Sequence, residues 1–164
     1  MKKLLISLIS IIILTQGCTS DKKKALEYNN KIAKLSTNYI DEAKEFGVKL
    51  KTAITTKDFS KLQEPYDELN KIIADDISQI NKLESVSGSE DMKTVMMDYL
   101  KFEQDMIVKG FGPFTKMTKT TTDKEIKAAT DDLMDMVKKE SDYLVKVRKV
   151  QQEFATKNGF QVGR

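Results

Sequence analysis

Apolar residues recur at intervals of three and four along four long segments of the chain, with polar residues filling the positions between them. This spacing is typical of amphipathic helices that each bury one face. A clear example is the stripe Ile126, Ala129, Leu133, Met136, Val137, Leu144, Val147, Val150 and Phe154. The pattern predicts helices at approximately 25–54, 58–86, 89–118 and 122–158.

Polar and turn-forming residues mark the first boundaries. The run 55–57 ends the first stripe, and Asp58 is a favourable N-cap for the second helix. Pro65 lies inside that second stripe. Either the helix kinks at Pro65, or a short turn precedes a helix that has Pro65 in its first position.

The later boundaries carry stronger signals. Gly88 suits the C-terminus of the second helix, and residues 112–113, a Gly-Pro pair, predict a break or kink in the third. Thr122 and Glu125 have the spacing of a capping box at the start of the fourth helix. Residues 158–160, Asn-Gly-Phe, predict a Schellman-type end.

The connections between these helices are only a few residues long, so sequential neighbours must run antiparallel. We therefore expect an all-α domain over residues 25–164, an antiparallel up-down-up-down four-helix bundle. In that arrangement the threonine-rich connections 55–58 and 119–124 share one end. The Gly88 connection and the C-terminus share the other.

The net charge of +3 comes largely from the first three residues, because Lys2 and Lys3 belong to an apolar leader segment. Without them, 26 basic residues face 25 acidic ones. The basic surface that nucleic-acid binding requires is therefore missing, and we expect no nucleic-acid partner.

The chain contains no histidine and one cysteine. Haem and di-iron sites in helical bundles use histidine, zinc sites use histidine and cysteine, and Ser-His or Cys-His nucleophile pairs need both partners. These classes are therefore excluded. We expect a non-enzymatic protein without a cofactor, apart from the lipid discussed below.

The N-terminus has the organisation of an export signal. Lys2 and Lys3 precede an apolar run at residues 4–14. This run is too short to span a bilayer, because a membrane-spanning helix needs about 20 residues. Gly17 and the lone Cys18 follow this run. A single thiol in an exported chain is unusual, because such chains normally pair their cysteines.

Residues 14–18, Leu-Thr-Gln-Gly-Cys, resemble the lipobox of bacterial lipoproteins. The resemblance implies cleavage between Gly17 and Cys18 and attachment of a diacylglyceryl group, often with an N-acyl chain such as palmitate, to Cys18. Residues 1–17 would then be the signal peptide and 18–24 a lipidated N-terminus with a short tether. The alternative is an ordinary signal peptide that leaves Cys18 as a free thiol.

This resemblance also implies a location. The chain would be exported and anchored through Cys18 to membrane lipid of the cell envelope. The anchor would lie in the outer membrane of a Gram-negative cell, because Thr19 rather than an aspartate follows Cys18. In any other cell it would lie on the outer face of the cytoplasmic membrane.

Two further residue groups are candidates for chemistry. Adjacent helical residues point about 100° apart, so at most one acid of the pairs 75–76 and 131–132 can face the core, and we expect surface charge. Seven methionines lie between residues 92 and 136. Thioethers suit copper(I), but Met92, Met96, Met106 and Met136 occupy the apolar stripes, which favours core packing.

The sequence thus supports two functions for an envelope lipoprotein. The first is a binding or structural module for another protein. The alternative is a protein that binds a small ligand or a soft metal such as copper. That ligand would use the methionine-bearing hairpin, or a pocket opened by the break at 110–113.

Overall fold

The computed structural model describes residues 20–163, and within this range the chain is helical and has no strand, which confirms the all-α class. Gly17, Cys18 and the predicted signal peptide lie outside the described residues. None of the helices within residues 20–163 is both long enough and apolar enough to cross a membrane. The elements are α1 (Ser20–Leu35), α2 (Ile40–Thr56), α3 (Gln63–Lys82), α4 (Glu90–Asp105), the π-helix η1 (Met106–Phe111), α5 (Gly112–Thr115) and α6 (Asp123–Lys157).

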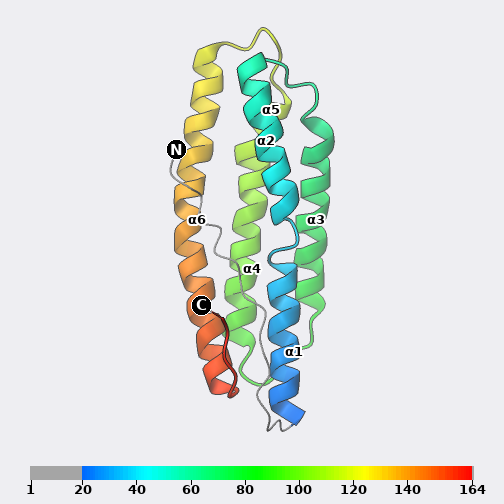
Figure 1. The fold of residues 1–164 in the computed structure, drawn as a ribbon, viewed down its shortest axis with the longest axis vertical. Coiled ribbons are helices and arrows are strands. Elements are labelled where there is room, and N and C mark those ends of the chain that lie inside the picture. The colour runs from blue at the N-terminus through cyan, green and yellow to red at the C-terminus, as the bar shows by residue number, and fades with distance from the viewer. Residues whose placement is uncertain (1–19, 164) are drawn as a thin grey trace.

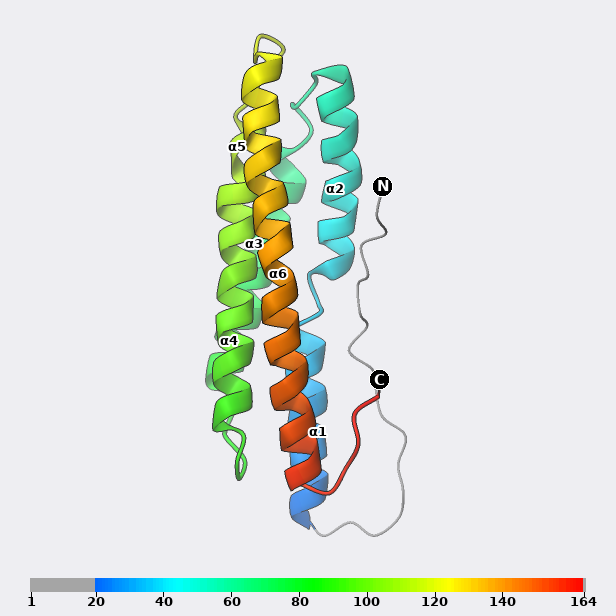
Figure 2. The same cartoon turned by 90° about the vertical axis from the view of Figure 1, so that its left-hand side faces the viewer.

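The helices lie side by side in an elongated molecule (Figures 1 and 2). α1 and α2 follow one another along one edge, and the continuous run α4–η1–α5 lies alongside α6. α4 packs against both α3 and α6, while α1 packs between α3 and α6. α2 packs mainly against α3, and in Figure 2 it stands away from α6.

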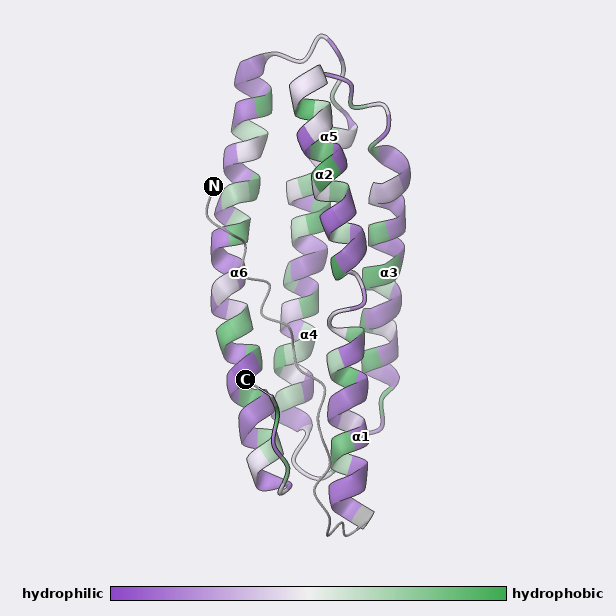
Figure 3. Ribbon diagram, in the orientation of Figure 1, coloured by the Kyte–Doolittle hydropathy of each residue, from purple (hydrophilic) through white to green (hydrophobic). Residues whose placement is uncertain are grey.

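The core is built from the apolar stripes, and Figure 3 shows hydrophobic and hydrophilic positions on every long helix. Each large apolar side chain that is fully buried contributes about 1.5–3 kcal/mol, so the stripes supply most of the driving force for folding. The most deeply buried apolar residues come from α1, α2, α3, α4, η1, α5 and the loop after α2: Ile32, Phe46, Leu62, Leu69, Ile73, Ile80, Met92, Met96, Leu100, Ile107 and Phe114.

The prediction of one continuous helix at 25–54 is wrong, because the chain leaves the helix between Leu35 and Ile40. The hydroxyls of Ser36 and Thr37 donate to the carbonyl of Ala33, at 2.9 and 3.0 Å. Such side-chain bonds compete with the helical ladder of the backbone. The apolar spacing continues through the break, and neither proline nor glycine marks it, so periodicity alone predicted a single helix.

Several other helix boundaries also differ from the prediction. α1 begins at Ser20, so residues 20–24 are helical rather than part of a tether. The second helix begins at Gln63 instead of 58, because Asp58 accepts hydrogen bonds from the Ser60 backbone and hydroxyl and so shapes a turn. Pro65 lies in the first turn of α3, where its missing N–H leaves no helical bond unmade, so no kink is required.

Gly88 does not end the second helix, since α3 already stops at Lys82. It occupies a tight turn with φ of +73°, in which the Ser89 N–H donates to the carbonyl of Val86 at 3.0 Å. The side chain of Ser89 accepts from the Val86 N–H at 3.0 Å and does not cap α4. Its oxygen stabilises the connection instead of the helix.

The predicted break at residues 112–113 is a widened helical turn. The Gly112 N–H donates to the carbonyl of Ile107, five residues earlier, which is the pattern of a π-helix. Pro113 has no N–H to give, and the π turn η1 lets the chain continue directly into α5. The third helical run therefore extends from Glu90 to Thr115.

The fourth helix matches its prediction closely. The Thr122 hydroxyl accepts from the Glu125 N–H at 3.3 Å, and the Glu125 carboxylate accepts from the Thr122 N–H at 2.8 Å, which confirms the capping box. At the other end Gly159 has φ of +70°, and the Phe160 N–H donates to the carbonyl five residues back at 3.0 Å. The ring of Phe160 packs edge-on against Phe154, a contact that often accompanies a Schellman end.

Candidate functional site

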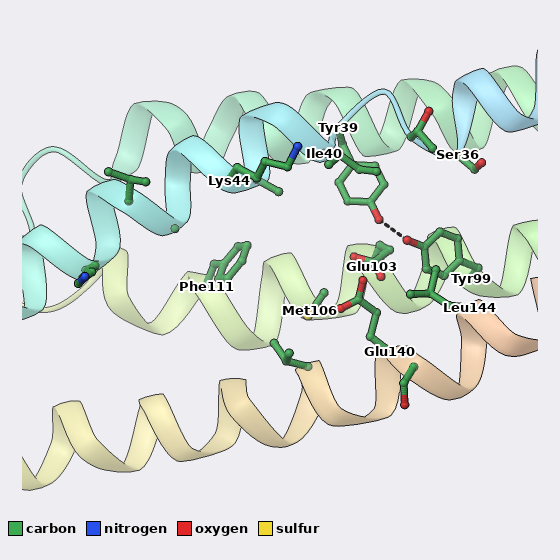
Figure 4. A pocket seen from close by; sticks show the side chains of 17 residues that line it. Ser36, Tyr39, Ile40, Lys44, Tyr99, Glu103, Met106, Phe111, Glu140 and Leu144 are labelled. Atoms are coloured by element: carbon green, nitrogen blue, oxygen red, sulfur yellow. Dashed lines mark hydrogen bonds between the residues drawn. The ribbon is translucent and has the colours of Figure 1, made fainter. Parts of the chain in front are cut away.

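A cavity of about 730 Å³ lies between the α1–α2 break, α2, α4, η1 and α6 (Figure 4). It exists because α2 packs on α3 and stands away from α6. Pockets that bind small molecules generally have volumes of about 300–1,000 Å³, so this one is large enough for a ligand. We call it the α2–α6 groove.

Most of the groove is apolar. Its walls include Ile40, Ala43 and Val48 from the α2 side and Val137 and Leu144 from α6. Gly47 also lines it, and a Cβ atom built at this glycine would meet no atom within 4 Å. A glycine inside a helix costs about 1 kcal/mol relative to alanine, and here it leaves the wall of the groove without a side chain.

The π turn shapes the opposite wall. In a regular α-helix, residues five apart point about 140° from one another, whereas the i to i+5 pattern of a π-helix places them one above the other. Met106 and Phe111 therefore both line the groove. Phe111 also stacks on Phe46 of α2, with ring centroids 4.6 Å apart, and so ties α2 to η1 at this end.

The other end of the groove is polar. Tyr39, from the α1–α2 break, and Tyr99, from α4, share a hydrogen bond between their hydroxyls at 2.7 Å. Glu103 lies one turn after Tyr99 and is only 2% exposed. In Figure 4 its carboxyl points toward that of Glu140 on α6.

Glu103 is a buried acid with an unsatisfied acceptor, because its Oε1 atom has no hydrogen-bond partner. Within residues 20–163, no ion pair joins Glu103 or Glu140 to a lysine or arginine. An acceptor left unsatisfied in this way costs about 1–3 kcal/mol. Tyr28, Glu42 and Asp76 also carry an unpaired buried oxygen, and among these acids Glu103 is the one that both lines the groove and is almost fully buried.

Burial raises the pKa of Glu103 to about 8, and the neighbouring charge of Glu140 acts in the same direction. The hydroxyls of Tyr39 and Tyr99 oppose this rise in pKa. Burial also raises the pKa of Glu140. At neutral pH, Glu103 is therefore mostly protonated while the groove is empty, and it gains a charge only if something stabilises the carboxylate.

The same surroundings raise the pKa of both tyrosines, chiefly through burial and then through the charge of Glu103. Tyr39 and Tyr99 thus stay neutral. Titratable groups with strongly displaced pKa values in a concave apolar site are a recognised mark of a functional site.

A second buried acid lies outside the groove. Asp76 is 0% exposed, so the expectation of surface charge is wrong for this residue. Its Oδ1 accepts from the Asn38 side chain at 3.3 Å, and burial raises its pKa to about 6. Asp75, Asp131 and Asp132 are exposed, as predicted.

The four methionines of the apolar stripes fill core volume. Met92, Met96 and Met106 are buried, and Met136 is partly buried against the core, as their stripe positions predicted. In the part of the chain that the structure describes, no three His, Cys, Asp or Glu residues gather as a metal-binding group.

A pocket opened by a break at 110–113 was one option within the alternative function, and Phe111 of that segment lines the groove. Nothing in the sequence reasoning pointed to the polar end of the groove, with Tyr39, Tyr99, Glu103 and Glu140. One signal was available, because residues 92, 96, 99, 103 and 106 form a single helical stripe in which position 103 alone is charged. A charge on a core stripe requires a special environment.

Comparison with known proteins adds no assignment. No protein-family model matches the chain, and no curated protein or solved structure is significantly similar to it.

Proposed function

We propose that this chain is a non-enzymatic, lipid-anchored binding protein of the bacterial cell envelope, and that its α2–α6 groove takes a small amphipathic molecule. The observation that carries the proposal is the unsatisfied buried carboxyl of Glu103 at the polar end of an apolar groove. An apolar wall gives affinity, and a few convergent polar groups give orientation.

This proposal favours the alternative function from the sequence over a partner protein. Protein interfaces are usually broad surfaces with a polar rim, whereas this feature is a concave space with its polar groups at one end. No nucleic-acid partner and no enzymatic activity are expected, for the compositional reasons given above. Copper binding in the groove has no support from the methionines, because Met106 is the only one of those at 92–136 that lines it.

We further propose that the helices form an antiparallel up-down-up-down bundle. One ion pair supports this arrangement at one end of the bundle. Lys57, just after α2, pairs with Asp123, at the start of α6, at 2.7 Å, so two connections meet there. At the other end, a Cβ atom built on Gly88 would lie 2.6 Å from the Lys157 ammonium, so the α3–α4 connection meets the end of α6.

The anchor rests on the lipobox resemblance at residues 14–18. From the start of α1 at Ser20 to Tyr39 the chain advances about 30 Å if it rises 1.5 Å per residue. The polar end of the groove would then lie within about 30 Å of the anchored end of the protein. Such a position suits a ligand that reaches the protein from the membrane or the space next to it.

The groove is tested by calorimetric titration of the full chain, purified in lipid nanodiscs, with 1-octanol. Gly47→Leu fills the groove, and Gly47→Ala is the matched control, because its methyl group meets no atom within 4 Å. We expect wild type and Gly47→Ala to bind octanol above the background of empty nanodiscs, and Gly47→Leu to lose that binding. Equal heats from all three proteins and the empty nanodiscs would contradict the proposal.

The anchor has a separate test. Cells that express wild type or Cys18→Ala are fed a labelled fatty acid, and the purified protein is assayed for label. We expect label on the wild type alone. Equal incorporation into both proteins would show that Cys18 is not the site of lipid attachment.

A further inference from the structure

The polar end of the α2–α6 groove contains acids without a base. Glu103 and Glu140 line the same space and point toward one another (Figure 4), and the Oε1 of Glu103 has no partner. Among the described residues neither acid forms an ion pair with a lysine or arginine. The polar end of the groove therefore holds two acids, and no basic side chain within residues 20–163 pairs with either of them.

The charged and titratable groups around Glu103 can be taken element by element. Tyr39 faces it from the α1–α2 break, Tyr99 from its own helix and Glu140 from α6, and no titratable group of α3 acts on it. Two lysines of α2 line the groove, and both are exposed at its rim. The ammonium of one of them, Lys44, already pairs with Asp41 at 2.8 Å.

What would complete this site is a positive group with several N–H donors. A primary ammonium has three donors and a compact charge, as the side chain of lysine does. Hydrogen bonds to ionised partners are about twice as strong as neutral ones, and they strengthen where water is excluded. A ligand carboxylate would instead bring a third acid to the same space.

We infer that the groove selects a primary alkylammonium ion, whose nitrogen binds between the carboxyls of Glu103 and Glu140 and whose hydrocarbon part lies along the apolar wall. This inference rests on the proposed function, because it names the class of ligand for the same groove. The tail would lie against Ala43, Val137 and Leu144, beside the space that Gly47 leaves open.

Binding is coupled to a proton. With the groove empty, Glu103 is mostly protonated at pH 7, because burial raises its pKa to about 8. An adjacent ammonium favours the carboxylate, so Glu103 releases its proton to solvent as the ligand enters. The charge at the site is thereby balanced, with one positive ligand bound and one proton lost. Ammonium affinity therefore rises as the pH approaches 8.

The test compares three ligands that share an eight-carbon tail: octylammonium, 1-octanol and octanoate. Each is titrated calorimetrically into the full chain in nanodiscs at pH 8. We expect octylammonium to bind at least about tenfold more tightly than octanol, and octanoate at least about tenfold more weakly, since one charge-assisted hydrogen bond contributes about that factor. Titrations at pH 7 in two buffers of different ionisation enthalpy should show release of close to one proton per octylammonium.

The variants separate charge from shape. Glu103→Gln keeps the size of the side chain, so the preference for octylammonium over octanol and the proton release should both disappear. Glu140→Gln should reduce the same preference. Glu153→Gln, on the exposed face of α6, is the matched control and should change neither.

Octanol binding as tight as octylammonium binding, or octanoate binding the tightest of the three, would overturn the ammonium inference and leave the groove's proposed function intact. If no ligand binds wild type better than it binds Gly47→Leu, both the inference and the proposed function fail.

Discussion

Replacing Glu103 with glutamine should stabilise the protein, and the gain should grow with pH. Glu103 has an ordinary carboxyl pKa of 4.5 when the chain is unfolded and a pKa of about 8 when burial in the folded protein disfavours its charge. Because the folded pKa is the higher one, the folded state holds more protons than the unfolded state between these values. The contribution of Glu103 to the stability of wild type is therefore most favourable at low pH and falls as the pH rises toward 8.

The magnitude follows from the two pKa values. Between the unfolded and the folded pKa, each unit of pH lowers the free energy of unfolding by about 1.4 kcal/mol. For values of 4.5 and about 8, the loss between pH 5 and pH 7.5 is about 3 kcal/mol. A neutral glutamine of the same size does not titrate, so Glu103→Gln should escape this loss.

The assay is urea unfolding of wild type and Glu103→Gln, followed by far-ultraviolet circular dichroism at pH 5, 6, 7 and 7.5. Other titrating groups change the free energy of unfolding of both proteins equally. The difference between the two free energies therefore reports the contribution of Glu103 alone. We expect that difference to widen by about 3 kcal/mol in favour of the variant over this range. A constant difference, or one that narrows with pH, would refute the claim that Glu103 is buried next to a second acid.

Three further substitutions test other parts of the structure by the same unfolding measurement. The free energy of unfolding of Asp76→Asn, relative to that of wild type, should rise by about 1 kcal/mol from pH 5 to pH 7, because burial raises the Asp76 pKa to about 6. If that difference does not change with pH, this carboxyl is hydrated. Gly47→Ala should stabilise the protein by about 1 kcal/mol, since alanine is the better helix former and its methyl group meets no atom; destabilisation would place α2 closer to its neighbours than the structure does. Thr122→Ala should cost about 1 kcal/mol through loss of the capping box, and no loss at pH 7 would indicate that α6 begins elsewhere.

Features encoded by adjacent residues were predictable from the sequence. The capping box at Thr122 and the end at Gly159 each depend on a few side chains and backbone angles within one turn, so short motifs identify them. The apolar stripes likewise predicted the helical class and most core residues, because their spacing records which face is buried.

Features that depend on competition or on distant contacts were not predictable in the same way. The break after Leu35 arises where hydroxyls of Ser36 and Thr37 compete with the backbone, although the apolar spacing continues across it. The π turn η1 retains the chain direction through a Gly-Pro pair that would ordinarily end a helix. Both depart from regular helix geometry over only a few residues, and residues of both line the groove.

The polar end of the groove was missed for a different reason. Tyr39, Glu103 and Glu140 come from three separate parts of the chain, and only the packed structure brings them together. Position 103 was nevertheless visible as a charge on an otherwise apolar stripe. An acid at such a position lowers stability at neutral pH, and a binding site gives a reason to keep it.

If an ammonium ligand binds at the Glu103 carboxyl in the α2–α6 groove, the titration of that carboxyl must change when the ligand is added. The most direct measurement is the ¹³C NMR signal of that carboxyl, assigned by comparison with Glu103→Gln and followed against pH with and without octylammonium. We predict a midpoint near pH 8 in the ligand-free protein that moves by at least about two units to lower pH with octylammonium, as release of nearly one proton at pH 7 requires, and does not move with octanol. A midpoint near the ordinary value of 4.5, or one that octylammonium leaves in place, would contradict the account.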